Sequence, residues 1–167
     1  YDLIEWGKPF EKSQHALPEP TLSEVLIRVT AAGLCHSDLH VQKGYMDLGE
    51  EGRLTFAERG AQLPMTFGHE IAGIVEAIGD KVKNVSIGQQ VIVFPWIGCG
   101  DCLACNEDRE SDCSAMRIIG LKQKGGFATH CLIENEKFLV NIDGLDAADV
   151  VPHACSGITV YNALEKI

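Results

Sequence analysis

Long apolar runs and positive charge are both scarce in this chain. No apolar run approaches the roughly 18 residues that a membrane-spanning helix needs, so the sequence predicts a soluble protein without a membrane partner. The 14 lysines and arginines are outnumbered by 24 aspartates and glutamates. The resulting formal charge of −10 argues against a nucleic-acid partner.

Signals of secretion and of a disulfide framework are missing as well. The N-terminus has no basic stretch followed by an apolar one, as a secretory signal would have. The seven cysteines are an odd number, which disfavours a disulfide scaffold. We therefore expect reduced thiols in a cytoplasmic protein. The length of 167 residues, with 46% apolar and 23% charged residues, suits one well-packed domain without internal repeats.

Four cysteines follow one another at gaps of two, two and seven residues: Cys99, Cys102, Cys105 and Cys113. This spacing is typical of a structural zinc site with four thiolate ligands. In bacterial iron-sulfur ligand runs, the last cysteine comes after a three-residue gap and is followed by a proline. Here the last cysteine, Cys113, comes after a gap of seven residues and is followed by Ser114. The glycines and acidic residues of segment 98–114 indicate a polar loop, which disfavours cysteines that are merely buried.

Short strands punctuated by turn residues dominate the first two-thirds of the chain, which favours an irregular β-barrel or sandwich. We expect them at Glu24–Thr30, Ile71–Ile78, Val91–Phe94, Phe127–Glu134 and Phe138–Val140. Residues Ala147–Ile167 have helical periodicity, interrupted by Pro152 and Gly157.

The segment Gly44–Leu63 mixes charge with glycine and predicts a surface excursion, with a short helix near Leu54–Arg59. Both a solvated connector and a lid or specificity loop fit this composition.

Three cysteines lie outside the loop. Cys35 follows a predicted strand among polar residues, and Cys155 precedes the last part of the predicted helix. Together with His69, which begins another strand, they could supply three protein ligands to a zinc ion with an open fourth position. Scattered residues of this kind are more often unrelated. Cys131 has strand neighbours and no ligand spacing, so we expect a buried free thiol.

Four motifs together resemble the zinc-dependent alcohol dehydrogenases of the medium-chain dehydrogenase/reductase superfamily. They are Gly33–His40, Gly68–Glu70 followed by Ala72–Val75, the four-cysteine loop, and Cys155–Tyr161. The resemblance covers nearly the whole chain and implies a mainly β fold with helices, a GroES-like irregular β-barrel. It also implies a catalytic domain over residues 1–145 and a helical segment over 146–167 that leads toward a Rossmann domain.

The resemblance further implies two zinc ions per chain, the catalytic one held by Cys35, His69 and Cys155. In such enzymes the oxygen of a small alcohol, aldehyde or ketone occupies the open zinc position, and hydride passes to or from NAD or NADP. Zinc makes this feasible by stabilising the oxygen anion. The complete protein is expected to be a homo-oligomer.

Further roles follow from the same resemblance. Ser37 and His40 match a proton relay through the cofactor ribose; Ser37 could also cap a short helix that starts after Cys35, and the two roles could coexist. Asp38 matches a carboxylate that orients the imidazole of His69. Glu70 matches an acidic neighbour of the zinc.

Two weaker expectations concern the ligand pockets. His36 falls where these enzymes contact the cofactor pyrophosphate, as a weaker anion partner than arginine. Trp96 could line the substrate pocket or serve only in packing.

Two departures from the family pattern limit these expectations. The segment Gly44–Leu63 is longer than in common relatives, which leaves substrate preference open. No Gly-x-Gly-x-x-Gly follows a strand, and the chain stops at Ile167, so we expect the N-terminal part of a longer dehydrogenase. A non-catalytic zinc-binding GroES-like module and a reductase of aldehydes or enones are the alternatives.

Overall fold

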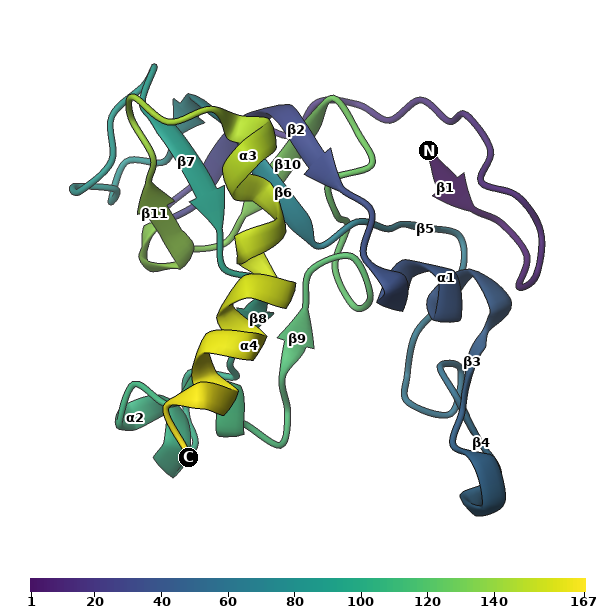
Figure 1. Ribbon diagram of the computed structural model, residues 1–167. Coiled ribbons are helices and arrows are strands. Elements are labelled where there is room, and N and C mark those ends of the chain that lie inside the picture. Colours follow the sequence, from purple (N-terminus) through teal and green to yellow (C-terminus); the bar gives the residue numbers. More distant parts are fainter.

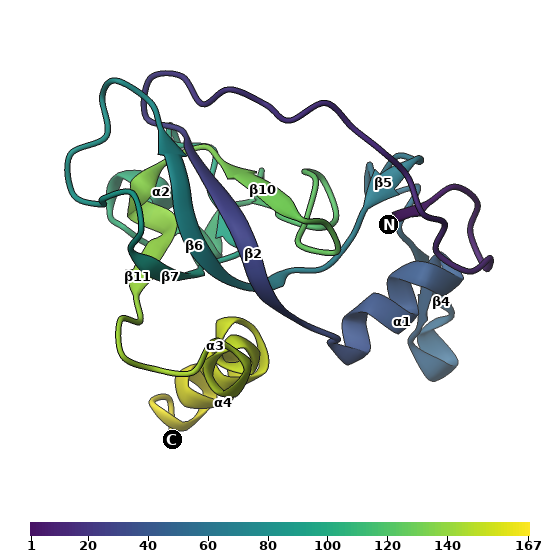
Figure 2. The same ribbon diagram turned by 90° about the horizontal axis from the view of Figure 1, so that it is seen from above.

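A five-stranded antiparallel sheet forms the centre of the molecule, in a computed structural model that describes residues 1–167 (Figure 1). The strand order is β10-β2-β6-β7-β11. The strands span β2 Val25–Gly33, β6 Glu70–Ile78, β7 Gln90–Val93, β10 His130–Ile133 and β11 Leu139–Asn141. The two long strands β2 and β6 run side by side through the middle of the sheet (Figure 2).

β-branched residues, most of them from this sheet, build the main core. Their side chains pack well on a pleated surface, and full burial of each contributes roughly 1.5–3 kcal/mol. The buried cluster comprises Val25, Ile27, Ile71, Val75, Val91, Val93, Ile97, Ile119, Cys131, Ile133 and Phe138. The expected burial of Cys131 is thus confirmed, with 3% of the residue exposed.

The segments before and after helix α1 (His36–Lys43) form a smaller lobe around it. Gly44 directly follows α1 and has a φ of 89°. That left-handed conformation favours glycine, and the Gly44 N–H donates to the carbonyls of His40 and Val41. Around α1 lie β1 (Asp2–Leu3) paired with β5 (Met65–Thr66), and β3 (Tyr45–Asp47) paired with β4 (Arg53–Thr55). Buried Leu3, Val41, Phe56, Ala61 and Phe67 form the core of this lobe.

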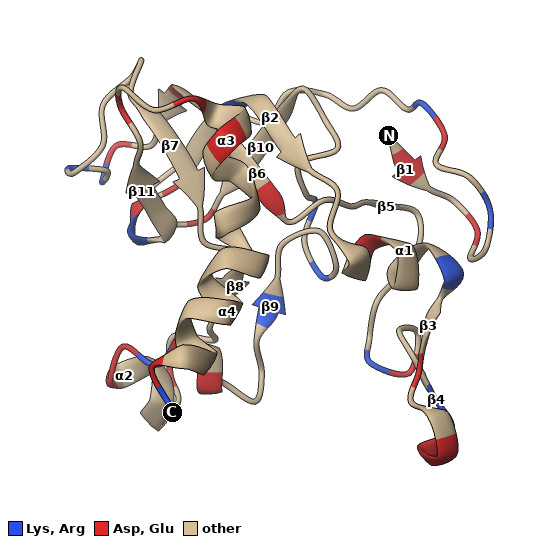
Figure 3. Cartoon of the chain, in the orientation of Figure 1, with Lys and Arg blue, Asp and Glu red and all other residues tan.

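The excursion Gly44–Leu63 contains a hairpin and not the expected helix at Leu54–Arg59. Leu54 and Thr55 belong to β4, and a succession of turns follows. Cross-strand pairing with β3 and the contact of Arg53 with the Tyr45 ring, at 4.3 Å, outweigh the local helical propensity. The hairpin projects from the body and carries acidic residues near its tip, in the 3₁₀ helix η1 Gly49–Glu51 (Figure 3).

The four-cysteine loop connects β8 (Trp96–Ile97) to β9 (Arg117–Ile118), which pair with each other. It contains one helical turn, α2 (Leu103–Asn106), and the 3₁₀ helix η2 (Glu110–Asp112).

The expected C-terminal helix is divided in three: α3 (Ala147–Val150), the 3₁₀ helix η4 (Val151–Ala154) and α4 (Ser156–Leu164). The interruption at Pro152 is confirmed, because proline cannot donate the helical hydrogen bond. The expected interruption at Gly157 is wrong, since this residue lies within the first turn of α4. A Cβ atom there would collide with His153, so the small residue allows the two helical segments to approach.

All five expected strands form, each with bounds that differ from the expected ones by up to three residues. β10 begins at His130 because the N–H groups of Gly126 and Phe127 donate to Gly68 and Phe67, away from the sheet partner β2. Phe138 ends the 3₁₀ helix η3 (Glu136–Phe138), and the strand β11 follows it. None of the helices combines the length and the apolar composition that a membrane span requires.

Candidate metal centres

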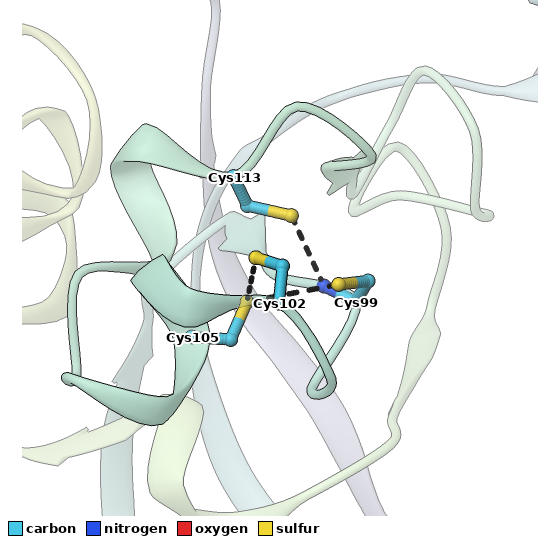
Figure 4. Close-up of side chains that lie close together, drawn as sticks. All are labelled: Cys99, Cys102, Cys105 and Cys113. Carbon is cyan, nitrogen blue, oxygen red and sulfur yellow. Dashed lines mark hydrogen bonds between the residues drawn. The ribbon is translucent and has the colours of Figure 1, made fainter.

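The four loop cysteines point toward one another (Figure 4). They come from both ends of α2 and from the flanking turns, and their sulfur atoms all lie within 4.8 Å of one another. The Cys102 and Cys105 sulfurs are 3.5 Å apart, and those of Cys99 and Cys105 are 4.0 Å apart. These separations are far too long for a disulfide.

The spacing suits one tetrahedral metal ion. With Zn–S bonds of about 2.3 Å, neighbouring sulfurs of a tetrahedron are separated by about 3.8 Å, which falls inside the observed range. All seven cysteines of the chain are free thiols. The loop residues therefore fit a zinc ion in both ligand chemistry and sulfur spacing.

The surroundings of the loop cysteines favour the thiolate form at Cys99 and disfavour it at Cys105. The N–H groups of Asp101 and Cys102, with help from neighbouring thiols, lower the pKa of Cys99 to about 6. At Cys105 the N–H of Gly100 favours the thiolate, but burial and the other three thiols outweigh it and raise the pKa to about 11. Four thiolates this close would repel one another, so their joint ionisation calls for a cation.

Gly98 is needed for close packing beneath this cluster, which the sequence pattern alone did not reveal. A Cβ atom at this position would collide with the Cys105 sulfur and with Glu110. Its only signal in the sequence is that a glycine directly precedes the first ligand cysteine.

A second cluster brings together Cys35, His69, Glu70 and Cys155, whose ligand atoms also lie within 4.8 Å of one another. Cys35 lies between β2 and α1, His69 and Glu70 lie at the start of β6, and Cys155 lies between η4 and α4. The sulfurs of Cys35 and Cys155 are 3.8 Å apart, as two zinc-bound thiolates would be. Residues 120 positions apart thus meet where three elements begin or end.

Asp38 joins two members of this cluster. Its Oδ2 accepts a hydrogen bond from the Cys35 backbone N–H at 3.0 Å, and its Oδ1 lies 3.2 Å from Nδ1 of His69. Because the carboxylate occupies Nδ1, Nε2 is the His69 nitrogen left for a metal. Only 1% of Asp38 is exposed, so water competes little for these bonds.

The helix start at α1 explains the placement of Cys35. Cys35 is the N-cap residue, and its sulfur accepts from the Asp38 backbone N–H while the Asp38 side chain binds the Cys35 N–H. The expectation that Ser37 caps this helix is therefore wrong, because α1 begins at His36, one residue before Ser37. Burial opposes the Cys35 thiolate, but hydrogen bonds from Ser37 and His69 prevail and lower its pKa.

The groups around His69 favour a positive charge on its ring. Burial disfavours the imidazolium, but the bonds to Asp38 and Cys155 outweigh burial and raise the pKa of His69 to about 11. Burial also raises the pKa of Glu70. Glu70 pairs with Gly33 across the sheet, and a Cβ atom at Gly33 would collide with the Glu70 carboxylate.

Of the remaining predicted site residues, Ser37 contacts the second cluster directly, because it hydrogen-bonds to the Cys35 thiol. His36, Ser37 and His40 share α1, and the rings of the two histidines are 4.8 Å apart. Trp96 packs against Phe94, with ring centroids 5.4 Å apart.

Comparison with known proteins identifies the family. The family model described as the alcohol dehydrogenase GroES-like domain matches residues 21–144. The chain belongs to this family.

Known proteins with similar sequences support this family assignment. An NAD-dependent alcohol dehydrogenase of Sulfurisphaera tokodaii is 40% identical over 98% of the chain and 46% of its own length. D-arabinose 1-dehydrogenase (NADP(+)) of Saccharolobus solfataricus is 32% identical over 98% of the chain and 44% of its own length.

A solved structure supports the same GroES-like fold. The alcohol dehydrogenase from Aeropyrum pernix has a TM-score of 0.84 and 28% identity, covering 99% of this chain and 46% of that one. The chain therefore spans about half the length of the curated relatives it matches, and its fold is that of the N-terminal domain of medium-chain dehydrogenases.

Proposed function

We propose that the complete protein carrying this chain is a zinc-dependent alcohol dehydrogenase. It would transfer hydride between a small alcohol, aldehyde or ketone and NAD or NADP. The observation that carries this proposal is the second cluster, in which Cys35, His69 and Cys155 converge from distant parts of the chain. A purely structural module would need only the four-cysteine loop.

Each cluster would hold one zinc ion, which gives two per chain. At the second cluster zinc would supply Lewis acidity, which stabilises negative charge on a substrate oxygen. The two thiolates and the imidazole of His69 would hold it, with Asp38 fixing the tautomer and direction of the ring. Glu70 offers a fourth donor atom, a carboxylate oxygen, from within the same cluster, and it would approach the metal during ligand exchange.

Helix α1 would carry the proton-transfer and cofactor groups. Ser37 and His40 lie three residues apart and therefore on neighbouring positions of one helix face. We propose that the Ser37 hydroxyl would take the substrate proton and that His40 would receive it next, with the ribose of a bound cofactor supplying the hydroxyl groups that link them. His36 is exposed at the helix start, where it would bind the cofactor pyrophosphate when protonated.

The four-cysteine loop would have a structural role. Structural zinc sites contribute folding free energy on the order of 10 kcal/mol, and this loop has only one turn of α-helix and one 3₁₀ turn of its own. Zinc binding would therefore fix the conformation between β8 and β9.

Several wider expectations belong to the same proposal. Residues 1–145 would form the catalytic domain and residues 146–167 the segment leading to a nucleotide-binding domain. The hairpin within Gly44–Leu63 would border the substrate entrance, and Trp96 would line the pocket. Seven free cysteines favour a reducing compartment such as the cytoplasm, and we expect the complete protein to form a homo-oligomer.

Metal content and turnover of the complete protein test the proposal together. Zinc analysis should give about two ions per chain, and alcohol oxidation should require NAD or NADP. Cys155→Ser should lower zinc by about one ion and abolish turnover while the loop retains its zinc. Cys131→Ala is the matched control, because this cysteine lies in the sheet core and should leave zinc content unchanged.

Two outcomes would defeat the assignment. If the protein holds one zinc that depends on Cys99 and not on Cys35, the second cluster is not a zinc site. If both sites hold zinc but no alcohol or carbonyl substrate turns over with either cofactor, the alternative function, a non-catalytic zinc-binding module, is favoured.

A further inference from the structure

His36 and His40 form a pair of histidines on the exposed side of α1. They are four residues apart, and their ring centroids lie 4.8 Å from each other at an interplanar angle of 53°. Residues at this spacing are neighbours on a helix surface. The same spacing of two histidines on one helix face binds zinc in H-E-x-x-H helices.

Neither imidazole has a carboxylate partner. His15, His69 and His130 are each paired with a carboxylate, of Asp2, Asp38 and Glu76 respectively. His36 is exposed and His40 is half-buried, so the ring nitrogens of this pair are open to a ligand from solution.

Helix geometry holds the pair in place. Cys35 caps the N-terminus of α1, Gly44 closes its C-terminus, and Val41 anchors it to the lobe core. A metal ion that bound both rings would therefore need only side-chain rotation. Once one imidazole is bound, the second is present at a high effective concentration.

We propose that His36 and His40 form a third, exposed metal site that chelates a late first-row divalent cation such as Ni²⁺ or excess Zn²⁺. Imidazole nitrogen suits these ions, and affinity rises from Co²⁺ to Ni²⁺ to Cu²⁺. The site differs from the cysteine clusters in ligand type and exposure, and it shares no ligand atom with them.

Occupancy would remove both histidines from their proposed roles. A cation bridging the two rings takes up the nitrogens assigned to the cofactor pyrophosphate and to the proton relay. Excess Ni²⁺ or Zn²⁺ should then inhibit turnover. This consequence rests on the proposed function, whereas binding itself does not.

Titration of the complete, zinc-loaded protein with Ni²⁺ tests the site without substrate or cofactor. Calorimetry should detect one added Ni²⁺ per chain, and His36→Ala and His40→Ala should each weaken binding by about tenfold or more as a bidentate site becomes monodentate. Paramagnetic broadening should affect the ring proton signals of His36 and His40 before those of His15 and His130. The exposed His153 supplies a control, because His153→Ala should leave the affinity unchanged.

A variant that keeps the number of histidines isolates chelation. His40→Ala combined with Lys43→His retains two imidazoles on α1 but separates them by seven residues, about 10 Å along the axis. It should bind Ni²⁺ no better than His40→Ala alone. Wild-type affinity in this variant or in both single variants, with circular dichroism unchanged, would overturn the proposal.

Discussion

Asp38 Oδ1 lies 3.2 Å from Nδ1 of His69, and this contact is almost completely shielded from water. The same carboxylate binds the backbone N–H of Cys35 at 3.0 Å. One buried side chain therefore fixes both the helix start that carries one thiol and the ring orientation of the imidazole. The geometry of the second cluster depends on a residue that would not itself touch the metal.

Asp38→Ala should lower the zinc affinity of the second cluster by about 10- to 100-fold, because the His69 ring loses its orienting partner. The lost cap should also reduce the free energy of unfolding by about 1 kcal/mol. Competition with a chromophoric chelator measures the affinity. Asp80→Ala, at an exposed turn, is the control. Equal zinc affinities of Asp38→Ala and wild type would mean that the contact does not position His69.

Gly33→Ala should destabilise the protein by about 1–3 kcal/mol, since the new methyl group meets the Glu70 carboxylate in a packed site. Gly33 is not one of the glycines with a positive φ, so the effect reports packing and not backbone strain. Denaturant unfolding measures it. The same substitution should destabilise less in a Glu70→Ala background, with a coupling of about 1 kcal/mol in the double-mutant cycle. Additive effects would mean that the Glu70 carboxylate is not the source of the clash, since alanine retains the Glu70 Cβ atom.

Gly98→Ala should weaken zinc binding by the four-cysteine loop, because its Cβ atom collides with the Cys105 sulfur. Gly100→Ala is a matched control two residues away. A Cβ atom at Gly100 meets nothing within 4 Å, although its φ of 86° disfavours alanine by about 1 kcal/mol. Metal analysis after chelator dialysis should show zinc loss in Gly98→Ala only. Equal losses in both variants would point to backbone strain as the cause.

The sheet and the four-cysteine loop were largely predictable because their signals are local. β6 was expected from β-branched residues between turn glycines, and the loop ligands from their spacing. The strands β1 and β5 were not expected: each has two residues and is held by pairing of Asp2 with Thr66 across 64 positions. The length of β10 was overestimated because Gly126 and Phe127 bond to a distant segment.

The second cluster needed the family resemblance, since its ligands lie far apart and their spacing carries no metal signal. The resemblance also pointed to Asp38, but its bond to the Cys35 N–H follows only from the helix start. The two packing glycines, Gly33 and Gly98, depend on neighbours across the sheet or within the loop. A sequence pattern does not encode such distances.

Burial raises the pKa of Cys131 to about 12, which makes part of the stability of the sheet core pH-dependent. The unfolded thiol ionises near pH 9, so above that pH the unfolded chain loses this proton while the folded chain keeps it. The contribution of Cys131 is therefore complete below pH 9 and decreases by about 1.4 kcal/mol per pH unit as pH rises toward 12. Urea unfolding of wild type and Cys131→Ala between pH 8 and 10.5 should show a steeper loss for wild type.

Alkylation rates give an independent measure of the same burial. At pH 9 the native Cys131 thiolate should be depleted on the order of 100-fold or more relative to the unfolded chain, and iodoacetamide reacts with the thiolate. Mass spectrometry of the zinc-loaded protein should therefore find Cys131 unmodified until urea unfolds the sheet. The six other cysteines belong to the two clusters, so removal of zinc should expose them to alkylation without exposing Cys131. Rapid native labelling of Cys131 would mean that the strand pair β10–β2 opens readily, because this thiol lies in the core that the pair covers.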